Sequence, residues 1–149
     1  MIEYENLQKL NEPFFEDFQK KFNEVMKSGW FILGKQVEEF EKKFSTFLMS
    51  KYCLGVGNGL DALSLALKSF DYPQNSEVIV PSNTYIATIL SILQNGLKPV
   101  LVEPQLDTYN IDPDKIEEKI TSNTRCIMVV HLYGKCCQME DRKSTRLNS

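Results

Sequence analysis

Apolar residues recur at helical spacing in the first third of the chain. The segment FFEDFQKKFNEVMKSG, residues 14–29, places Phe14, Phe18 and Phe22 on one stripe, and its closing Ser-Gly is a stop signal. The segment KQVEEFEKKFSTFL, residues 35–48, repeats the pattern. The apolar hexamer GWFILG lies between them, and a glycine costs roughly 1 kcal/mol inside a helix. The pattern therefore predicts two helices separated by an apolar, non-helical link.

From residue 52 onward, short apolar runs alternate with helical patterns. The predicted strands are YCLGV (52–56), EVIVP (77–81), PVLVE (99–103) and RCIMVVHLYG (125–134), the last of which runs into a loop. The predicted helices are LDALSLALKSF (60–70), TYIATILSILQN (84–95) and DKIEEKIT (114–121), and Asp112-Pro113 opens the last one. Strands this uniformly apolar are typical of a sheet covered by helices on both faces. The alternation predicts an α/β fold with a largely parallel sheet.

Composition excludes several classes of function. The chain has 149 residues, of which 42% are hydrophobic and 25% charged, so it suits one soluble globular domain or a piece of a larger one. Its net charge of -3 provides no basic patch for nucleic acid. No apolar run reaches the roughly 18 residues of a membrane span, and the N-terminus is not a signal peptide. The four cysteines contain no Cys-x-x-Cys spacing, so we expect neither zinc nor disulfides, and a reduced, cytoplasmic compartment.

A glycine-rich junction precedes the first helix of the alternating region. In GVGNGLDAL, Gly57 and Gly59 allow a tight turn, and the amides of Gly59, Leu60 and Asp61 form a helix N-terminus that suits a phosphate. Leu60 stands where a dinucleotide fingerprint needs its third glycine, and no P-loop Gly-Lys follows. An ordinary turn with Asp61 in the first helical turn explains the spacing equally well. A phosphate site further requires the carboxylate of Asp61 to point away.

Five ordered stretches together carry a family resemblance: SGWFILGKQVEEFE, GVGNGLDALSLAL, EVIVPSNTYIAT, KPVLVEPQLDTYNIDP and IMVVHLYGK. Residues 1–140 resemble the N-terminal part of the DegT/DnrJ/EryC1/StrS sugar aminotransferases, which are fold-type-I enzymes that use pyridoxal 5′-phosphate (PLP). The stretches PSNTYIATIL and HLYGKCC are most similar to enzymes that aminate C3 of a dTDP-linked 3-oxo-6-deoxyhexose. The resemblance implies an N-terminal helical segment (1–50) followed by an incomplete PLP-binding large domain (51–140).

The resemblance also assigns cofactor-binding residues. It implies that Gly59, Leu60 and Asp61 hold the PLP phosphate. Many relatives have Thr in place of Leu60, and the hydroxyl of that Thr adds a hydrogen bond that Leu60 cannot make. Tyr85 matches the aromatic residue that stacks on the pyridine ring, where a flat face holds a flat cofactor. A half-buried helix aromatic is the alternative for Tyr85.

Three further features are left without a single assignment. His131, the one histidine, is expected at the end of the last strand, where it either orients a ligand or is simply a structural residue, the commoner case. Lys135 stands where many relatives have Gln near the cofactor, and we assign it no role. The hexamer GWFILG either contacts substrate or a second subunit, or packs in the core.

The residues that define PLP chemistry are absent from residues 1–140. The resemblance places the aspartate that pairs with the pyridine nitrogen, and the lysine that forms the Schiff base, farther along the chain. We therefore expect no catalytic residue in this chain and no activity from it alone. The final DRKSTRLNS (141–149) resembles a translated sequencing-library adapter, so we expect the gene product to continue differently after Glu140.

The resemblance implies a nucleotide-linked keto sugar as substrate, an amino donor such as glutamate, and a homodimer in the full-length protein. A dehydratase of the same fold, in which His replaces the Schiff-base Lys, is one alternative. A non-catalytic remnant that binds the cofactor is another. The residue that discriminates the two enzymes lies outside the sequence.

Overall fold

The computed structural model describes residues 5–139, which form two compact units divided between Gly55 and Val56. The first unit is helical. It consists of α1 (Leu7–Asn11), the 3-10 turn η1 (Glu12–Phe14), α2 (Phe15–Ser28) and α3 (Lys35–Phe47). The two predicted helices are confirmed as α2 and α3, and Gly29 ends α2 in the left-handed conformation at φ 66°.

The first unit exposes its apolar side chains. Neither α2 nor α3 contains a buried residue, and Phe18, Phe22 and Phe40 are 53–64% exposed. The link between the helices is more open still, because Trp30 through Leu33 are 63–80% exposed. Of the two interpretations of GWFILG, core packing is therefore not seen among the described residues.

The second unit alternates helices and strands. Its elements are α4 (Gly59–Ser69), β1 (Glu77–Pro81), α5 (Ile86–Gln94), β2 (Lys98–Val102), α6 (Pro113–Ile116), the 3-10 turn η2 (Glu117–Lys119), β3 (Thr124–Ile127) and the 3-10 turn η3 (Leu132–Gly134). The three strands are parallel in the order β2-β1-β3, so β1 is central. The predicted α/β fold with a parallel sheet is confirmed.

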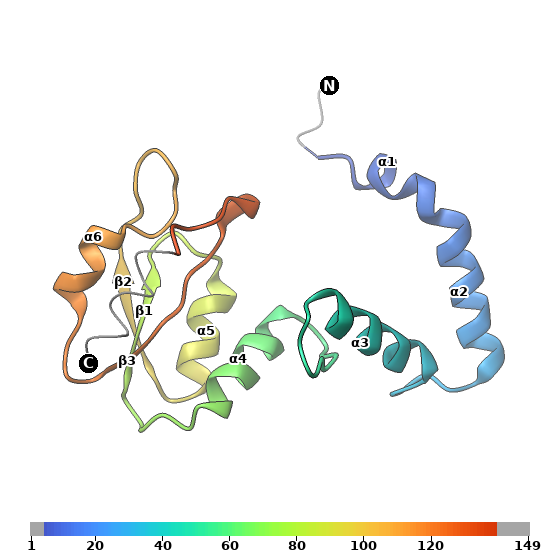
Figure 1. Ribbon diagram of the computed structural model, residues 1–149, viewed down its shortest axis with the longest axis horizontal. Coiled ribbons are helices and arrows are strands. Elements are labelled where there is room, and N and C mark those ends of the chain that lie inside the picture. Colours follow the sequence, from blue (N-terminus) through green and yellow to red (C-terminus); the bar gives the residue numbers. More distant parts are fainter. Residues whose placement is uncertain (1–4, 140–149) are drawn as a thin grey trace. The chain divides into compact units, whose positions relative to one another are not determined.

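Alternate residues of β1 point into two separate cores. Val78 and Val80 pack with Leu67 of α4 and Ile92 of α5, whereas Ile79 packs in the cluster of Val102, Ile111, Ile116 and Cys137. Figure 1 shows α5 and α6 on opposite sides of the sheet. Every residue of β1 is buried, which explains why Val78, Ile79 and Val80 are apolar without alternation.

Two predicted strands differ from the structure. Residues 52–56 form no strand, and the amide of Gly55 donates to Oε1 of Glu41 at 2.7 Å, so a side chain stands in for a neighbouring strand. The last strand ends at Ile127 rather than His131. Met128 still donates to the carbonyl of Ile79, but β1 ends soon afterwards at Pro81, which has no N–H.

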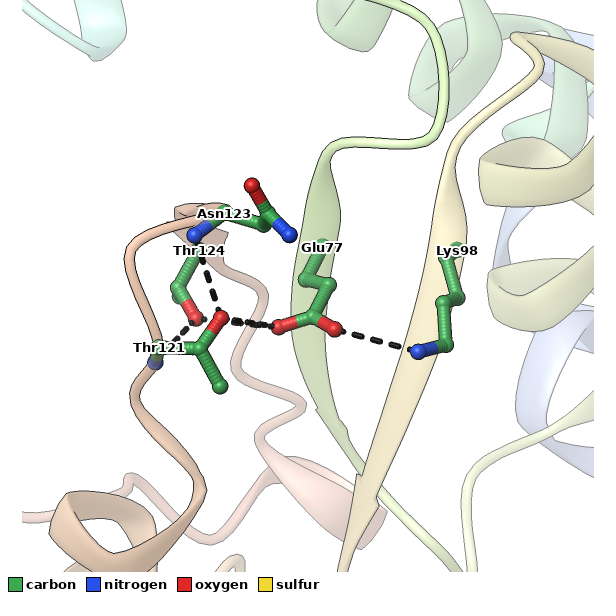
Figure 2. A network of polar contacts seen from close by, with 5 residues as sticks. All are labelled: Glu77, Lys98, Thr121, Asn123 and Thr124. Atoms are coloured by element: carbon green, nitrogen blue, oxygen red, sulfur yellow. Dashed lines mark hydrogen bonds and ion pairs between the residues drawn. The ribbon is translucent and has the colours of Figure 1, made fainter.

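A polar network closes the amino end of the sheet (Figure 2). The carboxylate of Glu77 accepts hydrogen bonds from Nζ of Lys98 at 3.1 Å and from Oγ1 of Thr121 at 2.6 Å. The hydroxyl of Thr124 approaches at 3.5 Å. These hydrogen bonds lower the pKa of Glu77 below its ordinary value. The bond from Thr121 has the largest effect on this pKa, and the bond from Lys98 has the second largest. Glu77 itself lies on β1 and is 7% exposed. Its carboxylate contacts Lys98 of β2 and Thr124 of β3, so one nearly buried ion connects all three strands.

No helix within residues 5–139 has both the length and the apolar character that a membrane crossing requires. The predicted tail, 141–149, lies outside the described residues.

Candidate functional site

The loops that follow the three strands lie together at the carboxyl end of the sheet. They comprise residues 82–85 after β1, 103–112 after β2 and 128–137 after β3. Ligands of open α/β sheets bind at this edge. Tyr85 and His131 both belong to these loops, so the topology supports the sequence-based choice of this edge.

The glycine junction forms the capped start of α4. Asn58 is the N-cap residue, and its Oδ1 accepts from the amide of Asp61 at 3.0 Å. Its Nδ2 donates to Oδ2 of Asp61, also at 3.0 Å. The Asp61 amide is therefore used inside the turn, whereas we expected it to be one of three amides available to a phosphate. The amides of Gly59 and Leu60 have no described partner.

The side chain of Asp61 also departs from what a phosphate site requires. Its Oδ2 lies 2.9 Å from the position of a Cβ added at Gly57, so the carboxylate folds back over the turn. A Cβ at Gly59 would meet nothing within 4 Å, so the approach to that residue is open. The turn can receive an anion at Gly59 and Leu60, provided that the Asp61 carboxylate turns away.

Tyr85 is the N-cap residue of α5 and is 78% exposed. Its φ of -63° and ψ of 142° turn the chain from β1 into the helix. The alternative of a half-buried helix aromatic does not match this exposure. An uncovered ring at this edge can stack on a planar ligand.

The structure places the four predicted residues at the N-terminal ends of two helices but does not link them. Gly59, Leu60 and Asp61 share the first turn of α4. The hydrogen bonds between α4 and α5 lie elsewhere, at Ser64 with Gln94 and Asn95. A cavity of about 950 Å³ runs along α4 past Gly57 and Asp61 toward the residues that precede β2, and Tyr85 does not line it.

Two asparagines that the sequence did not single out connect the three loops. Asn83 donates from Nδ2 to the carbonyl of Tyr109 at 2.9 Å, which joins the β1 loop to the β2 loop. Asn110 is 4% exposed and donates from Nδ2 to the carbonyls of Lys135 and Cys136 at 3.1 and 3.2 Å. Its Oδ1 accepts from the amide of Leu132 at 3.3 Å. Both ends of this buried amide therefore hold the β3 loop.

No sequence signal marked Asn110, because its partners lie 22 to 26 residues away. Asn83 had a weak signal, since it follows an apolar strand within the polar run SNT. Lys135 contributes its carbonyl to this arrangement, and its side chain is exposed.

Known proteins resemble this chain over nearly its whole length. A model of the DegT/DnrJ/EryC1/StrS aminotransferase family matches residues 14–145. A dTDP-3-amino-3,6-dideoxy-alpha-D-galactopyranose transaminase from Aneurinibacillus thermoaerophilus is 56% identical over 140 residues, which is 94% of this chain and 39% of the relative. A dTDP-3-amino-3,4,6-trideoxy-alpha-D-glucose transaminase from Streptomyces venezuelae is 42% identical and covers 78% of this chain and 31% of its own length. The chain thus spans about two fifths or less of these relatives.

Solved structures agree with the sequence relatives. The structure of S. venezuelae DesV in complex with a ketimine intermediate matches with a TM-score of 0.87 and 37% identity, over 93% of this chain and 38% of that protein. The structure of ntda from Bacillus subtilis with bound cofactor PMP matches with a TM-score of 0.83 and 38% identity, over 89% of this chain and 31% of that protein.

Proposed function

The chain belongs to the DegT/DnrJ/EryC1/StrS aminotransferase family, and we propose that the protein containing it transfers an amino group to a keto group of a nucleotide-linked deoxysugar. The substrate class that we favour is a dTDP-3-oxo-6-deoxyhexose aminated at C3. The observation that carries this choice is the 56% identity to the Aneurinibacillus transaminase, whose name specifies a dTDP-linked 3-amino-3,6-dideoxy sugar.

We further propose that the cofactor is PLP, with its ring against Tyr85 at the carboxyl end of the sheet and its phosphate at the start of α4. The open approach to Gly59, the two amides without a described partner and the exposed ring of Tyr85 fit its phosphate and its ring. Bound PLP supplies an electron sink for the transfer of the amino group. In this proposal the residues of this chain bind and orient the cofactor, whereas the catalytic aspartate and lysine lie farther along the complete protein.

The proposal includes glutamate as amino donor, a homodimer as the active form and a cytoplasmic location. The donor and the dimer rest on the family resemblance. The location rests on the cysteine pattern of the sequence. Sedimentation of the complete protein, with and without PLP, tests the dimer directly.

The decisive experiment uses the complete protein encoded at this locus. Incubation with PLP, glutamate and a dTDP-3-oxo-6-deoxyhexose should convert the keto group into an amine, detected by mass spectrometry and by NMR of C3. Omission of glutamate should reduce the reaction to one turnover of any amine form already present. Replacement of glutamate with alanine or glutamine identifies the donor.

The alternatives give different products. A dehydratase would remove a hydroxyl group from a 4-keto-6-deoxy sugar and leave no amine in the sugar. A cofactor-binding remnant would bind PLP and convert neither sugar. Either result would overturn the proposed aminotransferase activity.

A further inference from the structure

The chain beyond β3 is held in place by contacts from other elements. The buried amide of Asn110 bonds to three backbone groups of residues 132–136. Cys137, 5% exposed, anchors the end of this loop in the core beside Ile79, and its Sγ lies 3.2 Å from the carbonyl of Val130. The loop from 131 to 137 is therefore fixed at both ends and in its middle.

This rigid loop presents exposed side chains. Tyr133 has a left-handed backbone (φ 50°, ψ 30°), yet its side chain is 89% exposed, so burial does not offset the strain. A hollow of about 390 Å³ beside it is lined by Tyr109, Leu132, Tyr133 and Lys135, with Asp107 and Thr108. The loop that Asn110 holds at Leu132, Lys135 and Cys136 therefore borders an open hollow. His131 directly precedes Leu132 and is not one of the residues that line this hollow.

The contact that His131 makes fixes which ring nitrogen carries its proton. The amide of Cys137 donates to Nδ1 of His131 at 3.0 Å. A nitrogen that accepts a hydrogen bond has no proton of its own, so the neutral ring carries its N–H at Nε2. The side chain is exposed, and among residues 5–139 nothing is described as bonded to Nε2.

We propose that His131 is a ligand-binding residue whose Nε2–H donates a hydrogen bond to an oxygen atom at the carboxyl end of the sheet. This inference rests on the proposed function. The acceptor is a carbonyl or oxyanion oxygen, supplied either by the cofactor ring or by the keto sugar. Asn110 and the amide of Cys137 are positioning groups, because they fix the loop and the ring tautomer without touching the ligand.

Two substitutions separate this role from a structural one. In His131→Asn, the amide oxygen can still accept from the Cys137 amide, but no donor reaches the position of Nε2. In His131→Gln, the longer side chain can place an amide N–H near that position, but it loses the contact with Cys137. We expect His131→Asn to keep the melting temperature and to weaken ligand binding roughly tenfold. We expect His131→Gln to lower the melting temperature and to bind the ligand better than His131→Asn.

The measurements use the complete protein and begin with the wild type. Titration of the apo form with PLP, followed by absorbance, gives cofactor affinity and spectrum, and steady-state assays of the holo form give KM for the keto sugar. A change in PLP affinity or spectrum identifies the cofactor as acceptor, whereas a change in KM alone identifies the sugar. If ligand affinity instead follows the melting temperature in both variants, the role is structural and the inference is wrong. A wild type that binds PLP but aminates no sugar would contradict the proposed function, not the cofactor arm of this inference.

Discussion

At the amino end of the sheet the polar side chains are paired with one another, whereas at the carboxyl end large side chains remain uncovered. Glu77 is nearly buried and bonded to Lys98 and Thr121 (Figure 2). At the other end, Tyr85 and Tyr133 are 78% and 89% exposed. The same three strands thus have one end whose polar side chains are hydrogen-bonded and one end whose aromatic side chains are exposed. The residues of the first end hold the sheet together, whereas those of the second are available to a ligand.

The largest loss of stability should come from a substitution in the buried central strand β1. Ile79→Ala removes a side chain that is 0% exposed, so the free energy of unfolding should fall by about 2–5 kcal/mol. Urea denaturation of the complete protein measures this loss. Ile120→Ala is the matched control, since Ile120 is 46% exposed, and it should cost much less. Equal losses in the two variants would contradict the assignment of Ile79 to the core.

A substitution at Asn110 should weaken both stability and ligand binding. Asn110→Ala leaves the carbonyls of Lys135 and Cys136 without their partner and should cost about 1–3 kcal/mol of unfolding free energy. It should also lower PLP or sugar affinity, because the loop with His131 loses its support. Asn123→Ala is the control at the amino end, where the described bonds of Asn123 come from its backbone, and a change within about 0.5 kcal/mol is expected. Unchanged ligand affinity in Asn110→Ala would show that ligand binding does not depend on the support that Asn110 gives to this loop.

A substitution at Glu77 should affect stability in a pH-dependent way and leave the ligand end unchanged. The hydrogen bonds from Thr121 and Lys98 lower the pKa of Glu77 from its ordinary 4.5, so its stabilisation is present above that value. The contribution is then lost as the pH falls through the lower pKa of the folded state. Melting temperatures of the wild type should therefore drop steeply below about pH 4.5, and those of Glu77→Gln should start lower and drop less.

The control for Glu77 is Glu118→Gln, an exposed glutamate of the neighbouring η2. It should follow the wild-type melting curve at each pH. PLP affinity at neutral pH should be the same in wild type and Glu77→Gln. A loss of affinity there would show that the two ends of the sheet are coupled.

The smallest effect on stability is expected at Tyr85. Because its ring is 78% exposed, Tyr85→Leu should change the unfolding free energy by no more than about 0.5 kcal/mol. Loss of the stacking face should nevertheless weaken PLP binding roughly threefold to tenfold. Tyr85→Phe keeps the face and should bind nearly as well as the wild type. Equal PLP affinity in all three proteins would exclude stacking by Tyr85.

Local patterns in the sequence predicted most of the elements. The helices α2 and α3 follow from the phenylalanine stripes, and β1 follows from an apolar run that both cores bury. The segment 52–56 has strand composition but no strand, because a strand needs a neighbour to bond its backbone. The last strand ended early for a related reason, since its neighbour β1 stops at Pro81.

The candidate site was predictable only in part. Glycine spacing and the family resemblance located Gly59 and Tyr85, and whether they bind the cofactor stays a prediction. The spacing could not show that Asn58 would hold both the amide and the carboxylate of Asp61. The role of Asn110 could not be predicted from the sequence, because Asn110 comes close to residues 132–136 only when the chain folds. Periodic patterns in the sequence do not indicate contacts over such separations.

The central place of β1 sets an order of assembly on the growing chain. Glu77 is separated by 21 residues from Lys98 on β2 and by 47 from Thr124 on β3, although the two strands lie on either side of β1. Closing the longer loop costs only roughly 0.7 kcal/mol more entropy, so the loop lengths favour β2 weakly. Synthesis favours it strongly, because β1 and β2 can pair before β3 has left the ribosome. Glu77 can therefore meet its lysine while its threonine partners are still inside the ribosome, and in this order the strand that leads to His131 docks last.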